Sequence, residues 1–438
     1  KHNEVAPAQH ELAPVFDTTN VAVDHNQLTM EVMKKVADKH GLVCLLHEKP
    51  FEGINGSGKH NNWSMITDDG VNLLDPGKTP SENIQFLVFL MAVIKAVDEY
   101  ADLLRISVAS AGNDHRLGAN EAPPAVVSIF LGDELTEVLK SIENNTYFTS
   151  HGAVQMDIGA TVLPHFVKDN TDRNRTSPFA FTGNKFEFRM LGSAASVANP
   201  NIVLNTAVAE ALDQFAKELD GVAPEDMEHA VHELIKRAIK KHKRVIFNGN
   251  GYTDEWIEEA EKRGLYNLKS TPDALPMWIA QKNIDLFTKH SIFTSEELHS
   301  RYEIWLENYS KTINIESNTM VEMVQKDLLP SVLSYVEEIA STASLKASVV
   351  PGISCESETT LITKLSELSD AMTKGLEKLK ADTAKAKATE DVLENAKLYQ
   401  TEVLEDMEEL RKSADEAETL IPDDLLPYPT YGKLLFYI

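Results

Sequence analysis

Alternation of apolar and polar residues is the clearest pattern in the first part of the chain. From Lys185 to Met190 the two kinds alternate with period two, which predicts a half-buried strand. Its apolar face would carry Phe186, Phe188 and Met190, and its polar face Lys185, Glu187 and Arg189.

Two more strands are predicted upstream of this one. Residues 42–46 form a short apolar run that is typical of a buried strand. Residues 60–66 alternate, so His60, Asn62 and Ser64 would share one face.

Helical spacing appears between these strands and dominates after about residue 201. Residues 26–40 and 81–104 have apolar positions three and four apart, and Ser81 and Asn83 are suitable helix caps. A kink is expected near Pro330, and the leucines of 361–379 with the apolar run of 403–410 predict an antiparallel helical hairpin. Further helices are predicted over 205–219, 224–243, 253–264, 272–288 and 295–340.

The change near residue 200 suggests four segments. We predict a catalytic segment over 1–200, a helical continuation over 201–350, a helical hairpin over 351–420 and a C-terminal tail over 421–438. This mixture predicts an α+β protein.

Charge and cysteine content exclude several functions. The chain has 438 residues, with 42 Lys and Arg against 68 Asp and Glu, which gives a net charge of −26. Such acidity argues against nucleic-acid binding and against a polybasic membrane patch. Two cysteines cannot make a disulfide framework, so a cytoplasmic location is expected. No apolar run approaches the ~18–20 residues that would span a bilayer.

Gly53–His60 nearly matches the phosphate-binding loop pattern GxxxxGK[ST]. We reject that interpretation because His60 replaces the required hydroxyl residue and a strand, not a helix, is expected to follow. A Gly-rich turn remains open, and so does a loop that lets a ligand approach its backbone while His60 points into a site.

Glu4 and Glu11 flank a short segment of small residues. Their odd separation puts them on opposite faces of a regular strand, so they can share a site only if Pro7 marks a bulge or turn. Two solvated carboxylates are the alternative.

Glu187 and Arg189 occupy one strand face, where a surface ion-pair ladder and a functional pair are both open. The loops 113–124 and 174–177 add further charged residues, Arg116, Glu121 and Arg175. Glutamates with one imidazole suit Mg²⁺ or Mn²⁺, and neighbouring arginines suit phosphate and carboxylate groups. Together these residues suggest ATP-dependent activation of a carboxylate.

At five places in the same order, the sequence resembles the motifs of glutamine synthetases, most of all the type III branch. These segments are EVAPAQHE (4–11), NGSGKH (55–60), RLGANEAP (116–123), NRTS (174–177) and KFEFR (185–189). The resemblance implies an antiparallel sheet that forms a half-barrel active site wrapped by helices, with a long helical C-terminal region. It also implies that L-glutamate and ammonia are joined at the expense of ATP through a γ-glutamyl phosphate. Two or more Mg²⁺ or Mn²⁺ ions per site and a homo-oligomer of two stacked hexameric rings are expected from it as well.

The resemblance also assigns roles to individual residues. One metal ion would be held by Glu4 and Glu11, and the second by His60 and Glu187. Glutamate would be bound by Asn55, Gly56, Arg116 and Arg189, and the nucleotide by Asn62, Ser64, Arg175 and Lys185. The catalytic residues would be Glu121, on a closing flap, and Arg175, at the transferred phosphoryl group.

Other parts of the family pattern would precede Glu4, namely further metal-binding glutamates and a small N-terminal domain that completes a neighbouring subunit's site. The chain by itself is therefore expected to bind metal poorly and to have little synthetase activity. Two other functions stay open: a related carboxylate–amine ligase that uses another amine, and a catalytically silent assembly or regulatory homologue.

Overall fold

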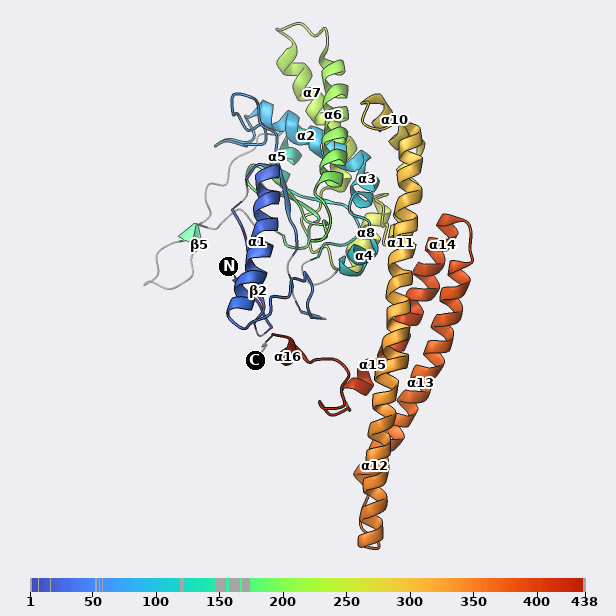
Figure 1. Cartoon of the computed structure of the whole chain (residues 1–438). Coiled ribbons are helices and arrows are strands. Elements are labelled where there is room, and N and C mark those ends of the chain that lie inside the picture. Colours follow the sequence, from blue (N-terminus) through green and yellow to red (C-terminus); the bar gives the residue numbers. More distant parts are fainter. Residues whose placement is uncertain are drawn as a thin grey trace. The chain divides into compact units, whose positions relative to one another are not determined.

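The fold is given by a computed structural model, shown in Figure 1. It describes residues 2–6, 8–15, 17–51, 53–54, 56, 58–118, 122–146, 155–156, 166–167 and 174–435. The chain forms two compact units. The first consists of residues 1–16 and 48–302, and the second of residues 17–47 and 303–438.

A four-stranded mixed sheet forms the centre of the first unit. Its strand order is β3-β8-β7-β4, with antiparallel pairing except between β4 and β7, which are parallel. The strands are β3 (Asn61–Trp63), β8 (Phe186–Phe188), β7 (Phe179–Phe181) and β4 (Ile129–Phe130). Two small antiparallel pairs are β1 (His2–Asn3) with β2 (His10–Glu11), and β5 (Gln155–Met156) with β6 (Phe166–Val167).

Strand β8 has the alternation that the sequence predicts. Phe186, Phe188 and Met190 are fully or almost fully buried, whereas Glu187 is half-buried. Phe179 of β7 stacks on Phe186 with the ring centroids 4.6 Å apart. The aromatic face therefore anchors the sheet in the core, and the opposite face is left for polar side chains.

The strand predicted over 42–46 is wrong. Residues 43–47 have no strand structure, and Leu42, Leu45 and Leu46 are each more than 40% exposed. An apolar run without period-two alternation does not by itself specify a strand. The strand predicted over 60–66 is present but shorter, as β3.

Helices cover the sheet of the first unit. Helix α2 (Ile84–Glu99) is buried along most of its length and packs against α6 (Ala198–Leu219) and α7 (Met227–His242). Asn83 caps α2 as predicted, accepting a hydrogen bond from the Phe86 amide at 3.1 Å. The other helices are α3 (Ala101–Ile106), α4 (Ala111–Arg116), α5 (Asp133–Asn144), α8 (Asp254–Lys262), α9 (Thr271–Ala274) and α10 (Gln281–Lys289), with 3₁₀ turns at Lys243–Val245 and Leu275–Ile279.

The second unit is built mainly from long helices (Figure 1). Helix α13 (Glu356–Lys387) packs against α12 (Leu329–Val349) and α15 (Leu404–Glu418), as the predicted hairpin requires. Its buried leucines and methionine follow the predicted steps of three and four: Leu365, Leu368, Met372, Leu376 and Leu379. The remaining helices described in this unit are α1 (Thr19–Lys39), α11 (Ser295–Met323, which begins in the first unit), α14 (Val392–Leu398) and α16 (Tyr431–Leu435). A π-helical segment, Tyr399–Val403, joins α14 to α15.

The irregularity expected near Pro330 is a π-helical segment, Val324–Leu328, between α11 and α12. Proline has no amide hydrogen for the preceding turn, so the regular hydrogen bonding is interrupted there. None of the helices in the described ranges combines the length and apolar character needed to cross a bilayer.

Candidate active site

The N-terminal strands place two separated carboxylates beside each other. Between β1 and β2 the chain reverses, with the Glu4 amide donating to Gln9 O and the Gln9 amide donating to Ala6 O, both at 3.1 Å. Ala8 adopts a φ of 59° in this reversal. A turn between Glu4 and Glu11 is what the sequence analysis required for them to share a site, although Pro7 itself lies outside the described residues.

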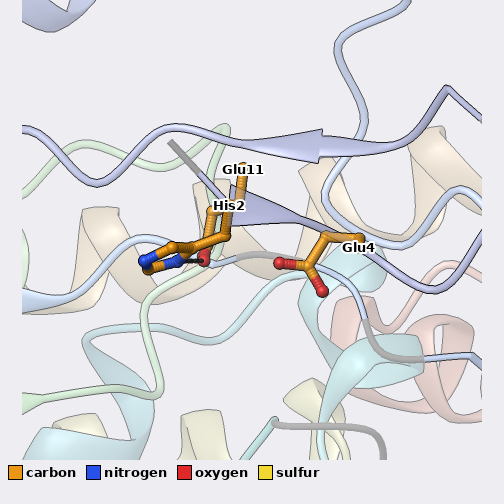
Figure 2. Close-up of side chains that lie close together, drawn as sticks. All are labelled: His2, Glu4 and Glu11. Atoms are coloured by element: carbon orange, nitrogen blue, oxygen red, sulfur yellow. Dashed lines mark hydrogen bonds and ion pairs between the residues drawn. The ribbon is translucent and has the colours of Figure 1, made fainter.

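His2, Glu4 and Glu11 form a cluster in which one ligand atom of each residue lies within 4.8 Å of the others (Figure 2). His2 Nδ1 is 3.3 Å from Glu11 Oε2, directly across the β1–β2 pair. The sequence analysis missed His2. Its signal was available, because a residue two positions before Glu4 lies on the same face of an extended strand.

A second cluster forms where β3 pairs with β8. The register places Asn62 opposite Glu187, so the predicted polar faces of the two strands lie next to each other. His60 Nδ1 is 3.8 Å from Glu187 Oε2. Arg189 binds the same carboxylate oxygen through Nε at 3.2 Å and Nη2 at 3.0 Å.

Charged residues of both clusters affect the pKa of His60. Partial desolvation and the positive charge of Arg189 lower the pKa of His60, whose side chain is still 45% exposed, while the negative charge of Glu187 opposes them. Arg116 also lowers the pKa of His60, and Glu11 raises it. Because charges influence one another over only a limited range in a protein, these charged residues lie within electrostatic range of His60.

Arg116 is fixed at the end of α4. Nη1 donates to Asn113 Oδ1 at 3.2 Å and Met190 O at 3.3 Å, and Nη2 donates to Arg189 O at 3.2 Å. Its Nε lies 3.4 Å from Glu48 Oε2. Burial lowers the pKa of Arg116, and the carboxylate of Glu48 opposes this effect. The side chain of Arg116 is only 3% exposed, so it is much more enclosed than a surface arginine.

Arg175 lies on an exposed turn next to Arg189. Asn174 anchors this turn by donating to Asn248 O and Gly249 O, at 3.2 and 2.7 Å. Arg189 Nη1 donates to Asn174 O at 2.6 Å. Arg189, directly after β8, therefore holds the turn that carries Arg175.

The residues assigned to the nucleotide lie on the outer part of the sheet. Asn62 and Ser64 are exposed, and Lys185 is half-buried. Ser64 Oγ is bonded within the protein, to Asn72 Oδ1 at 2.7 Å and to Asn184 O at 3.1 Å.

The Gly-rich segment lies close to Glu48. Gly56 is buried, and a Cβ atom at this position would lie 2.0 Å from Glu48 O, so the close approach requires glycine. Residues 61–63 form a strand directly after His60, which is the reason given above for rejecting a phosphate-binding loop. The residues Asn55 and Glu121, which the sequence analysis assigns to glutamate binding and to the flap, lie outside the described residues.

This donor set fits a divalent cation. The carboxylates of Glu4, Glu11 and Glu187 with the imidazoles of His2 and His60 are oxygen and nitrogen donors that suit Mg²⁺ or Mn²⁺. The arginines beside them suit phosphate and carboxylate groups. Chemically, these groups suit a divalent cation next to anionic groups.

Family profiles match two parts of the chain. Residues 1–127 match the glutamine synthetase catalytic domain, and residues 230–346 match the glutamine synthetase C-terminal domain. The first match includes Glu4, Glu11, His60 and Arg116, and the second runs from α7 into α12.

Relatives align along the whole of this chain. A glutamine synthetase of Butyrivibrio fibrisolvens is 59% identical, and 62% of its length is covered. A type-3 glutamine synthetase of Dictyostelium discoideum is 47% identical, with 60% covered, and a glutamine synthetase of Bacteroides fragilis is 40% identical, with 61% covered. The chain thus spans 60 to 62% of the length of these relatives.

Proposed function

We propose that the chain belongs to the glutamine synthetase family and that it carries residues of an active site that joins ammonia to L-glutamate at the expense of ATP. The products would be L-glutamine, ADP and phosphate. As in the resemblance described above, the α+β fold would complete a half-barrel, and the enzyme would be a dodecamer of two hexameric rings.

The chemistry explains why such a site needs metal ions and arginines. The γ-carboxylate of glutamate is a poor electrophile, and transfer of the γ-phosphoryl group of ATP to it forms γ-glutamyl phosphate and ADP. Ammonia then attacks the carbonyl carbon, and phosphate leaves. Phosphoryl transfer depends on positioning and on neutralising negative charge.

The two clusters suit this task. Glu4 and Glu11, joined by His2, would hold one cation, and His60 with Glu187 would hold a second. Bound cations would supply the positive charge that offsets the phosphates of ATP and the carboxylates of glutamate. Arg189 keeps the Glu187 carboxylate oriented through its two hydrogen bonds.

The remaining residues would bind the substrates. Arg116, with Gly56 and Asn55, would bind glutamate, and Arg175 would neutralise the transferred phosphoryl group. Asn62, Ser64 and Lys185 would lie along the nucleotide. Glu121 would belong to a flap, which is needed because an acyl phosphate hydrolyses when it is exposed to water.

One observation supports this proposal above the others. Glu187 Oε2 lies 3.8 Å from His60 Nδ1 and accepts two hydrogen bonds from Arg189, and the carbonyl oxygen of Arg189 accepts one from Arg116. A surface ion-pair ladder on β8 alone would not bring a histidine from before β3 and an arginine from α4 to the same place.

The test is glutamine formation by the enzyme in its natural assembly, with glutamate, ATP, ammonium and Mg²⁺ or Mn²⁺. We expect glutamine and phosphate in equal amounts, and a loss of at least about 100-fold in Glu187→Gln, which removes the anionic donor and keeps the shape. Glu82→Gln makes the same change at an exposed position outside the site, and it is the matched control. Phosphate release with methylamine but not with ammonium would favour a related carboxylate–amine ligase, and no phosphate release with either would overturn the proposal.

A further inference from the structure

Most N–H groups of the Arg116 guanidinium already donate hydrogen bonds to acceptors of the protein. A guanidinium has five N–H groups. Both hydrogens of Nη1 have acceptors, Asn113 Oδ1 and Met190 O, and one hydrogen of Nη2 has Arg189 O. A substrate carboxylate that binds in a bidentate manner must therefore use the edge formed by Nε and Nη2.

Glu48 lies against that edge. Its Oε2 atom is 3.4 Å from Arg116 Nε. The backbone of Gly58 faces the same edge, since a Cβ atom there would be 2.6 Å from Nη2 and 3.7 Å from Nε. Because Gly58 has no side chain, it does not cover this edge of the guanidinium. The carboxylate that lies against the edge is Glu48.

Glu48 does not depend on Arg116 for its own stabilisation. Its Oε2 atom accepts a hydrogen bond from the Ser193 amide at 2.8 Å. The contact with Arg116 is longer than the ~2.7–2.9 Å of a charge-assisted hydrogen bond. If Arg116 turned to another carboxylate, Glu48 would keep its backbone donor and would not become an unpaired buried charge.

We propose that Glu48, when no substrate is bound, occupies the position on Arg116 that the α-carboxylate of glutamate takes, and that this competition lowers the affinity for glutamate. The proposal rests on the role of Arg116 in the proposed function. An incoming α-carboxylate would take the Nε–Nη2 edge with two hydrogen bonds and displace the single, longer contact of Glu48. A ligand without that carboxylate leaves the Glu48 contact in place, so Glu48 would not lower the affinity for such a ligand.

The experiment compares wild type with Glu48→Gln in the natural assembly, with glutamate as the varied substrate and ATP fixed. Glutamine at position 48 keeps an oxygen acceptor for the Ser193 amide and removes the charge. We expect the KM for glutamate to fall by about three- to tenfold with kcat and the KM for ATP unchanged, because the competing carboxylate is gone. Binding of 4-aminobutyrate, which lacks the α-carboxylate, should not become tighter by the same factor.

An unchanged or higher KM for glutamate in Glu48→Gln would overturn the proposal, because Glu48 would then only support Arg116. Equal tightening of glutamate and 4-aminobutyrate would also overturn it. Glu82→Gln, an exposed carboxylate outside the site, is the control and should match wild type. If Glu48→Gln does not fold, Glu48→Asp keeps the charge but shortens the side chain, and it must still lower the KM for glutamate. Glutamine formation by wild type is read separately, so failure of the proposed function is distinguished from failure of this inference.

Discussion

His60, which directly precedes β3, has its Nδ1 atom 3.8 Å from Oε2 of Glu187 on the neighbouring strand β8. This relationship follows from the pairing of Asn62 with Glu187, because it aligns the polar face of β3 with the polar face of β8. A shift of one residue in that register would turn Glu187 toward the aromatic core. The buried rings of Phe186 and Phe188 prevent the shift, so core packing fixes the position of the site.

Removal of Phe186 should therefore weaken the whole sheet. Phe186 is fully buried and stacks on Phe179 at 4.6 Å. We expect Phe186→Ala to lower the free energy of unfolding by about 3–5 kcal/mol, measured by urea denaturation. The control Ile66→Ala changes an apolar side chain that is 68% exposed, and it should stay within about 0.5 kcal/mol of wild type. Equal effects of both variants would show that the aromatic face does not anchor the sheet.

His2 should contribute to metal binding. It shares the cluster with Glu4 and Glu11, and its loss removes one donor atom while the two carboxylates remain. We expect His2→Ala to weaken Mn²⁺ binding by about 10- to 100-fold in a titration calorimetry measurement. His10→Ala is a matched control, because His10 lies on the same hairpin and contacts Asn3 Oδ1 at 3.2 Å. Unchanged Mn²⁺ affinity in His2→Ala would exclude His2 from the site.

Regular patterns made much of the fold predictable. The period-two faces of β8 and the leucine spacing of α13 were predicted because each burial pattern is local in sequence. The structure of residues 42–46 was predicted wrongly, because an apolar run without periodicity does not specify which kind of element it forms. Likewise, α1 begins at Thr19 rather than near Asn26, and it leaves Leu28 exposed.

The site was predictable as a set of residue types but not as a set of contacts. The motifs single out Glu187 and Arg116, yet the contact of Arg116 with Glu48 joins segments that no local pattern relates. The same holds for the parallel pairing of β4 with β7, which depends on the path of the chain between them. The roles of the site residues remain predictions that the experiments here test.

Asn113 should be needed to hold Arg116 in place. It is buried, its Nδ2 donates to Val108 O and Met190 O, and its Oδ1 accepts from Arg116 Nη1. We expect Asn113→Ala to cost about 1–3 kcal/mol of folding stability, because buried acceptors lose their donor. The KM for glutamate should rise while the KM for ATP stays constant. Asn26→Ala, at an exposed position, is the control, and an equal rise of both KM values would argue against a role through Arg116.

The carboxylate of Asp213 should make stability depend on pH in a defined acidic range. Lys289 Nζ joins α10 to α6 by binding Asp213 Oδ2 at 2.8 Å and Glu210 Oε2 at 2.6 Å. Hydrogen bonds from Lys217 and Lys289 lower the pKa of Asp213 from 3.8 to about 2. A lowered carboxylate pKa stabilises the folded state above the unfolded pKa, and this contribution is lost as the pH falls through the folded pKa.

The difference in unfolding free energy between wild type and Asp213→Asn should therefore be constant near neutral pH. It should shrink as the pH falls below 3.8 and approach zero only below pH 2. Denaturant titrations between these pH values and neutrality measure it, with Asp220→Asn as the control, because Asp220 is an exposed carboxylate at the end of the same helix. A difference that stays constant down to pH 2 would mean that Lys217 and Lys289 do not hold the Asp213 carboxylate in its charged form. The link between α6 and α10 would then have to come from Glu210 and from apolar packing alone.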